Sequence, residues 1–366
     1  MQCAGFVVQI LPDLVGLFDA LHADGRAIIG PTVRGDAIIL AELDEPAALP
    51  YGWRADVAAG RYRLRHDGEP RAFTHTSSPQ SWKQVVHPPR ERLLSADRTD
   101  DGFTVDAEAP EPRRIALLGV RPCDLRAIGV LDRVLGDGGR YAGRRREMFV
   151  VAVNCTEPGD ACFCVSAGGG PRAGAGYDLA LTERPDGTYL ATAGTALGAT
   201  LLDRLPGIPA TAAEVSAGDE AVDGAASRMG RALPPGDLRS LLTERRDSPH
   251  WEDVGARCLT CANCTMVCPT CFCTSVTDTT DVTGDHAERW QTWDSCFDLN
   301  FSHIHGGPVR TSRDSRYRQW LTHKFSAWHD QFGESGCVGC GRCIAWCPVG
   351  IDITAELQAF NAEGTT

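Results

Sequence analysis

Two short runs of cysteines carry the strongest chemical signal in this sequence. In each run four cysteines are followed directly by a proline, and the positions are Cys258, Cys261, Cys264 and Cys268 in the first run and Cys337, Cys340, Cys343 and Cys347 in the second. The spacing Cys-x2-Cys-x2-Cys-x3-Cys-Pro is the one with which bacterial ferredoxins hold [4Fe–4S] clusters. Two such runs in one chain predict a protein that binds two [4Fe–4S] clusters.

The fourth cysteine of each run lies beyond the loop that the first three form. In two-cluster ferredoxins this fourth cysteine ligates the other cluster. The expected ligand sets are therefore crossed: Cys258, Cys261, Cys264 and Cys347 for one cluster, and Cys337, Cys340, Cys343 and Cys268 for the other. Gly339 and Gly341 allow the second run to bend sharply and to bring backbone N–H groups near the sulfur atoms.

Zinc and disulfides are the two alternatives for these cysteines. Zinc sites use four ligands, usually as two separated pairs, whereas each run here supplies four cysteines at short spacing and ends in proline. Nothing at the N-terminus reads as a signal peptide, so the chain is expected to stay in the reducing cytoplasm, where disulfides are rare. Both observations favour iron–sulfur clusters.

Four further cysteines fall in the first half of the chain. They are Cys123, Cys155, Cys162 and Cys164. A third [4Fe–4S] cluster held by these four thiols is one hypothesis, and buried free cysteines that behave as small apolar residues are the alternative. Of the remaining cysteines, Cys271, Cys273 and Cys296 are interpreted either as supplementary ligands or as lining of the cluster environment, and Cys3 as inert.

The elements around Cys123 and Cys155 predict a βαβ unit. Apolar strands are expected at 115–120 and 148–153, and an amphipathic helix at 125–135, with Asp124 as its N-cap. Cys123 then lies where the first strand meets the helix, and Cys155 lies just past the second strand. Sites in open α/β sheets gather at these carboxyl ends of strands.

The rest of the first half predicts mixed secondary structure. We expect a helix over 11–21, a hairpin from 27–29 and 37–40, a strand at 62–65, a turn or short helix with little regular structure over 81–94, a hairpin from 177–181 and 188–192, and helices over 196–205 and 212–229. The glycine-rich stretch 168–176 is followed by a strand rather than a helix, so it does not fit a dinucleotide-binding fingerprint and is expected to be a solvated loop.

The second half is expected to be helical, with helices near 238–246, 251–257, 317–332 and 353–360. The composition changes at about 235–245, which we take as the domain boundary. The predicted fold class is α+β: an α/β domain over residues 1–240, followed over residues 241–366 by an α-helical ferredoxin-type domain with two clusters and an insert between the cysteine runs.

Length, composition and charge set the protein class. The chain has 366 residues, 43% of them hydrophobic, which is ordinary for a folded protein of about two domains. A net charge of −12 argues against nucleic acid as the main partner, and no apolar run is long enough for a membrane span. Local basic patches at 144–146 and 310–318 are interpreted as solvated surface or as a docking face for an acidic partner protein. His303 and His305 are expected in a solvated loop.

Several short motifs carry a family resemblance that extends from about Ser81 to Asp352. They are Gly119-Val120-Arg121-Pro122-Cys123-Asp124-Leu125-Arg126-Ala127-Ile128, Asn154-Cys155, Cys162-Phe163-Cys164, Cys268-Pro269-Thr270-Cys271, Trp293-Asp294-Ser295-Cys296 and His323-Lys324-Phe325, together with the second cysteine run. With these the chain resembles the beta subunit of cytoplasmic NAD(P)-linked [NiFe] sulfhydrogenases. It is also similar to the electron-transfer subunit of anaerobic sulfite reductase.

The resemblance implies an electron-transfer iron–sulfur subunit with no catalytic site of its own. Its partners would be a flavin subunit that binds NAD(P) and the small and large subunits of a [NiFe] hydrogenase. Electron transfer in a sulfite reductase is the alternative terminal reaction, and a self-contained iron–sulfur enzyme is the alternative of another class. Because every iron of the two crossed sites would have a cysteine ligand, no iron is left open for a substrate, which favours electron transfer.

Overall fold

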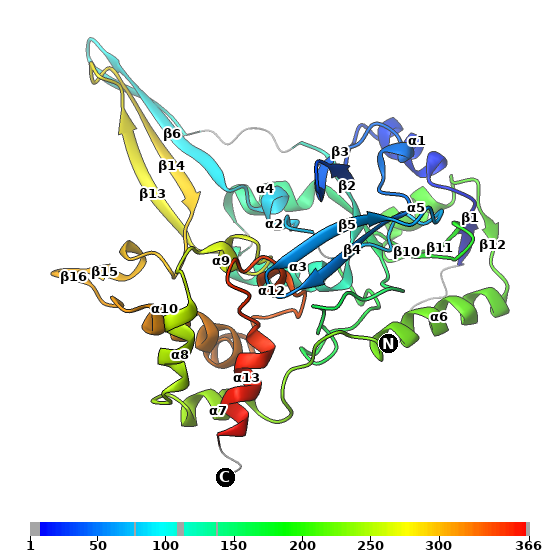
Figure 1. Ribbon diagram of the computed structural model, residues 1–366. Helices are drawn as coiled ribbons and strands as arrows, with labels where there is room; N and C mark the ends of the chain where they lie inside the picture. Colours follow the sequence, from blue (N-terminus) through cyan, green and yellow to red (C-terminus); the bar gives the residue numbers. More distant parts are fainter. Residues whose placement is uncertain (1–7, 77, 108–112, 137, 364–366) are drawn as a thin grey trace.

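The computed structural model describes residues 8–76, 78–107, 113–136 and 138–363. An eight-stranded mixed sheet dominates the first half of the chain (Figure 1). Its strands lie in the order β12 (Ile208–Pro209), β1 (Gln9–Leu11), β11 (Tyr189–Ala193), β10 (Leu179–Glu183), β9 (Met148–Val153), β8 (Ile115–Val120), β2 (Ala27–Arg34) and β3 (Ala37–Glu42). The four central strands, β2, β8, β9 and β10, run parallel, and the outer pairs are antiparallel.

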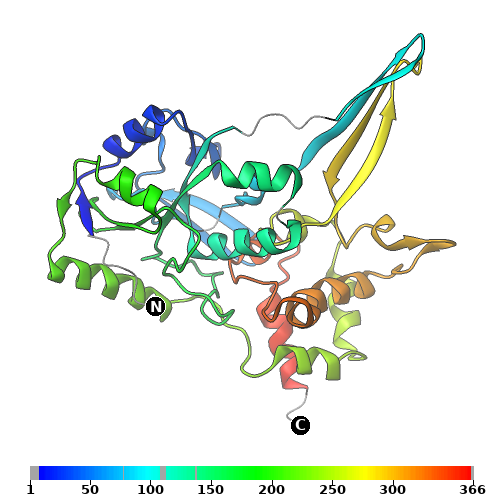
Figure 2. The same ribbon diagram turned by 180° about the vertical axis from the view of Figure 1, so that it is seen from behind.

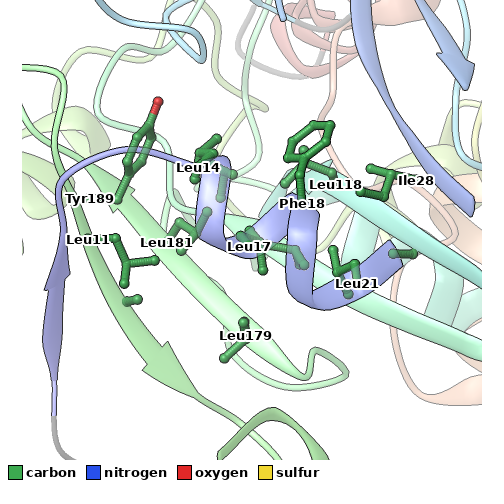
Figure 3. Packing of buried hydrophobic residues seen from close by; sticks show 14 of the residues in the cluster. Leu11, Leu14, Leu17, Phe18, Leu21, Ile28, Leu118, Leu179, Leu181 and Tyr189 are labelled. Carbon is green, nitrogen blue, oxygen red and sulfur yellow. The ribbon is translucent and has the colours of Figure 1, made fainter. Parts of the chain in front are cut away.

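Helices cover both faces of this sheet because the central strands are apolar on both sides. Leu118 of β8 packs with α1 (Val15–Ala23) and its flanking Leu14, as Figure 3 shows. Leu117, the preceding residue, packs on the opposite face with α3 (Pro122–Leu135). Side chains alternate between faces along a strand, so strands buried on both faces have near-continuous apolar runs. The other helices of this half are α2 (Lys83–Val86), α4 (Gly139–Arg146), α5 (Ala196–Leu202) and α6 (Ala212–Ala226).

A second sheet projects from the body as a long arm, which both views show clearly (Figures 1 and 2). Its four antiparallel strands are β13 (Thr274–Thr280), β14 (His286–Trp293), β6 (Arg90–Thr99) and β7 (Gly102–Asp106). The arm thus joins a hairpin from between the cysteine runs to a hairpin from the first half of the chain. A separate hairpin, β4 (Trp53–Ala58) and β5 (Arg61–His66), packs against the C-terminal helices.

Short helices surround the two cysteine runs. They are α7 (Leu238–Glu244), α8 (His250–Arg257), α9 (Asn263–Met266), α10 (Arg313–Thr322), α11 (Trp328–Phe332), α12 (Arg342–Ala345) and α13 (Ile353–Ala362), with a π-helical turn at His323–Ala327, 3₁₀ turns at Pro46–Ala48 and Asn300–Ser302, and a small hairpin of β15 (His303–Ile304) and β16 (Gly307–Pro308). Trp251, Trp320 and Phe360 form part of their core, which also takes in Tyr62 and Phe163 from the first half of the chain. The hydrophobic core therefore continues across the boundary predicted from the sequence.

Most elements expected from local pattern are confirmed, including the parallel βαβ unit, the hairpins and the helices at 196–205, 212–229 and 353–360. Three expectations were wrong in whole or in part. Asp124 is not the N-cap of α3; Arg121 is, Pro122 begins the helix, and Asp124 lies in its first turn. The stretch 81–94 contains the expected short helix, α2, but its last residues begin strand β6, which was not expected. The insert before the second run is not helical throughout, because it contributes β13 and β14 to the arm.

Candidate iron–sulfur centres

The first three cysteines of run one and the last cysteine of run two line one cavity. These thiols are Cys258, Cys261, Cys264 and Cys347, and Cys343 of the second run also lies at this cavity. The backbone N–H of Thr260 donates to Cys258 Sγ at 3.4 Å, and that of Ile351 donates to Cys347 Sγ at 3.3 Å. Phe297, Tyr317 and Trp320 complete an apolar wall. Four thiols with N–H donors around a common space are the donor set that a [4Fe–4S] cluster needs.

The other four cysteines of the two runs also lie near one another. The charges of Cys337, Cys340 and Cys268 all act on the buried thiol of Cys343, whose pKa burial raises well above its ordinary value. The N–H of Gly339 donates to Cys337 Sγ at 3.5 Å. Both groupings follow from the contact between α9, which holds Cys264, and α12, which holds Cys343.

The two runs adopt the same backbone shape. The second residue after the first cysteine has a positive φ in each run, 52° at Thr260 and 69° at Gly339. The fourth residue does too, with 64° at Ala262 and 74° at Gly341. Left-handed conformations cost a residue with a side chain about 1–2 kcal/mol. Run one therefore holds strained residues at both positions, whereas run two uses glycine.

Close packing explains why the second run needs glycine. A Cβ atom on Gly339 would lie 2.5 Å from the Cα of Cys164, and one on Gly341 would lie 2.3 Å from the carbonyl oxygen of Ala161. These are backbone atoms, so they cannot move aside as a flexible side chain could. The second run is thus pressed directly against the loop that carries Cys162 and Cys164.

Alanine at Gly339 is expected to lower the content of bound iron and to destabilise the chain by more than about 2 kcal/mol, the sum of a left-handed Cβ and a backbone clash. The equivalent change in run one, Thr260→Gly, relieves strain and is expected to leave stability within about 1 kcal/mol of wild type. Iron analysis and anaerobic thermal unfolding of both variants measure this difference. Equal behaviour of the two variants would contradict the packing argument.

A buried lysine lies against the fourth cysteine of run one. The Lys324 ammonium donates to Cys268 Sγ at 3.3 Å and to Thr270 Oγ1 at 2.9 Å. Burial alone would lower the pKa of Lys324, but the negative charges of Cys268, Cys271 and Cys337 raise it well above its ordinary value. A hydrogen bond from Cys271, together with this ammonium, in turn lowers the pKa of Cys268. The site therefore favours a thiolate at Cys268, the form that binds metal.

The four cysteines considered for a third cluster also gather at one cavity. Cys123, Cys155, Cys162 and Cys164 line it, and Cys340 of the second run lies at the same cavity. The guanidinium of Arg121 donates to Cys155 Sγ at 3.8 Å and to the carbonyl oxygen of His75 at 3.0 Å. The βαβ unit brings Cys123 and Cys155 together, as the strand-end argument predicted.

A buried ion pair joins this cavity to the second run. Arg342 and Asp124 are 3% and 2% exposed, and their side chains form two hydrogen bonds of 2.8 and 3.0 Å. Arg342 Nε also donates to the carbonyl oxygen of Ser78 at 3.0 Å. Because Asp124 follows Cys123 directly and Arg342 precedes Cys343, the pair fixes the two cysteine groups relative to each other.

The spacing of these thiols does not suit a single metal ion. Among the described residues, no three His, Cys, Asp or Glu side chains lie close enough together to bind one. Thiolates that share one zinc ion, at about 2.3 Å each, would lie within about 4 Å of one another. Thiols spread around a cavity fit the separate iron corners of a cluster better than they fit zinc.

Sequence reasoning missed the polar groups that support these centres. Lys324, Arg121 and Asp124 occur in the motifs that carry the family resemblance, but nothing in their local pattern shows which sulfur atoms or side chains they contact.

Other expectations from the sequence were confirmed only in part. His303 and His305 are exposed, as expected, but His303 lies in strand β15 rather than in a loop, and the stretch 168–176 has no helix or strand. Arg316 of the 310–318 patch is buried and binds the carbonyl oxygen of Phe297, so this patch is not all solvated surface. Cys3 lies outside the described residues.

Comparison with known proteins finds a match over the region of the two cysteine runs. Residues 257–351 match the family model of a 4Fe-4S dicluster domain. The chain is 33% identical over 289 residues to the sulfhydrogenase 2 subunit beta of Pyrococcus furiosus, an alignment that covers 76% of this chain and 82% of that protein. No solved structure matches the chain. No helix in the described part of the chain is long and apolar enough to cross a membrane. The chain therefore belongs to the sulfhydrogenase beta-subunit family and contains a 4Fe-4S dicluster domain that binds [4Fe–4S] clusters.

Proposed function

We propose that this protein is the electron-transfer subunit of a soluble [NiFe] hydrogenase complex. It would relay electrons between a flavin subunit that binds NAD(P)H and the small and large subunits of the hydrogenase arm. The observation that carries the proposal is the chain of adjacent thiol groups, which extends from the first cavity through the second run to the cavity at Cys123. When bound, [4Fe–4S] clusters accept and release single electrons.

The proposed ligands of the first cluster are Cys258, Cys261, Cys264 and Cys347, and those of the second are Cys268, Cys337, Cys340 and Cys343. The common cavity of the first set and the mutual charge effects in the second support this assignment. A third cluster would take Cys123, Cys155, Cys162 and Cys164, which share a cavity that Cys340 also reaches. The chain's own residues hold the sulfur atoms, supply N–H donors to them and exclude water with aromatic walls.

One end of this series is open to a partner protein. Cys261 is exposed, and Leu259 and Val349 at the rim of the first cavity are 56% and 41% exposed. The second set is more enclosed, since none of its four cysteines is exposed as Cys261 is. Apolar side chains around an exposed ligand suit the docking of another protein, because water is displaced where electrons must pass. We therefore place the contact with one redox partner at this rim.

Paired substitutions test the crossed ligand scheme through iron content. In the crossed scheme Cys258→Ala with Cys347→Ala disrupts a single cluster, so about four irons per chain should be lost. Cys337→Ala with Cys347→Ala disrupts two clusters and should lose about eight. Iron and acid-labile sulfide are measured on protein purified without oxygen. The reverse order of losses would mean that each run holds its own cluster.

Electron transfer itself is tested by reducing the wild-type chain in an EPR titration. A reversible signal from reduced [4Fe–4S] clusters supports the proposal. Clusters that hold the fold but cannot be reduced would give no such signal, and the chain would then be a structural subunit.

A further inference from the structure

A further cavity at the base of the arm is lined by three more thiols, those of Cys271, Cys273 and Cys296. The hairpin of β13 and β14 brings them together, because Cys273 directly precedes β13 and Cys296 follows shortly after β14. The N–H of Asp294 donates to the carbonyl oxygen of Cys273 at 2.8 Å, which fixes the two ends of the hairpin side by side. Asp294 also lines the cavity.

Two buried lysines face these sulfur atoms. Lys83 is 2% exposed and Lys324 is 6% exposed. The Lys83 ammonium donates to the carbonyl oxygen of Thr265 at 3.4 Å and lies 3.7 Å from the ring centroid of Trp293. In the described part of the chain neither ammonium forms a salt bridge with a carboxylate. Burying an ammonium costs several kcal/mol unless a negative charge lies nearby.

Sulfur atoms lie around both lysines: Lys324 lines the cavity of the three thiols and donates to Cys268 Sγ at 3.3 Å. Cys271 exerts the largest charge effect on Lys83, and Cys268 and Cys271 exert the two largest on Lys324. The two ammonium groups also repel each other. Neutral thiols would leave two buried ammonium groups without a counter-charge, so the pair of lysines is best explained by an anionic group that forms when these cysteines bind metal.

We propose that Cys271, Cys273, Cys296 and Asp294 bind an additional [4Fe–4S] cluster, with Asp294 as the one oxygen ligand. The three thiols would lose their protons on binding. With four anionic ligands an oxidised cluster carries a net charge of about −2, which the ammonium groups of Lys83 and Lys324 offset. A single ion is not the better occupant, because no three potential ligands among the described residues are close enough together for one.

The site would extend the proposed series of clusters to the base of the arm. Cys271 donates a hydrogen bond to Cys268, a proposed ligand of the second cluster. Cys296 exerts the largest charge effect on Cys264, a proposed ligand of the first cluster. The additional site thus adjoins one ligand from each of the two clusters, although its own four ligands belong to neither of their sets.

The first test is the iron and sulfide content of the full chain purified without oxygen. Cys273→Ala with Cys296→Ala should lose about four irons and four sulfides per chain, while the EPR signals of the two clusters in the cysteine runs remain. Thr277→Ala, in exposed β13 and outside the cavity, should lose none. Unchanged iron in the double variant would overturn the proposal. If the ligand sets of the proposed relay were wrong, the iron loss of the variant Cys258→Ala with Cys347→Ala would show it instead.

The second test keeps the proposal open to refutation if the double variant does not fold. Asp294→Cys would give the cluster four sulfur ligands. We expect the iron content to stay as in wild type and one EPR signal and its reduction potential to change. The proposal would be wrong if Asp294→Cys left every cluster signal and potential as in wild type.

Discussion

Asp124→Ala is expected to destabilise the chain by about 3–5 kcal/mol, because it leaves the buried guanidinium of Arg342 without its carboxylate. The loss is large for a single substitution, since the whole stability of a domain is about 5–15 kcal/mol. Arg342 lies within the second cysteine run, so the variant is also expected to bind less iron at both Cys340 and Cys123. Anaerobic thermal unfolding and iron analysis measure the two effects.

A double variant separates the ion pair from simple packing. Asp124→Leu with Arg342→Met removes both charges and is expected to recover much of the stability lost in Asp124→Ala, since apolar pairs often replace buried ion pairs at little cost. If the double variant instead lost as much stability as the sum of the losses in Asp124→Leu and Arg342→Met, the packing of this contact, rather than its charge, would determine the stability.

Cys340→Ser is expected to have the largest effect on function. Cys340 is a proposed ligand of the second cluster and lies at the cavity of the proposed third one. We expect the NAD(P)H-linked activity of the complex to fall by more than about 100-fold, beyond the roughly 10–100-fold that loss of an outer-shell contact causes. Activity of the hydrogenase arm with an artificial dye should survive. EPR of the reduced variant should show one cluster signal lost or converted.

The control for this prediction is Thr277→Ser, in exposed β13 and away from every proposed ligand. It should retain the two cluster signals of the runs. If NAD(P)H-linked and dye-linked activities fell together in Cys340→Ser while the complex still assembled, the relay would not run through this chain.

The sequence was most informative where the pattern is local. Cysteine spacing predicted the two runs, and apolar strands around 115–120 and 148–153 predicted the parallel unit that brings Cys123 and Cys155 together. The crossed ligand sets remain a prediction, which rests on the fourth cysteine lying beyond the reach of its own loop. The strain at Thr260 and the need for glycine at Gly339 depend on what packs outside the run, which spacing does not show.

Contacts between residues far apart in the sequence could not be predicted from local sequence pattern. Strand β6 pairs with β14, a segment nearly two hundred residues away, so residues 90–99 alone gave no sign of the arm. Asp124 has the residue type and position of a helix cap, yet its carboxylate binds Arg342 from the other end of the chain. Lys83 and Lys324 are usually surface residue types, and only their burial beside cysteines reveals a role in supporting anionic sulfur.

A reductive EPR titration of the wild-type protein tests whether adjacent clusters in this one chain carry electrons. We expect at least about two reduced [4Fe–4S] spins per chain, with signals broadened by their interaction. In Cys258→Ala with Cys347→Ala the remaining signal should become narrower as a neighbouring spin is lost. A wild-type spectrum of isolated, unbroadened clusters, or of clusters that cannot be reduced, would contradict the account.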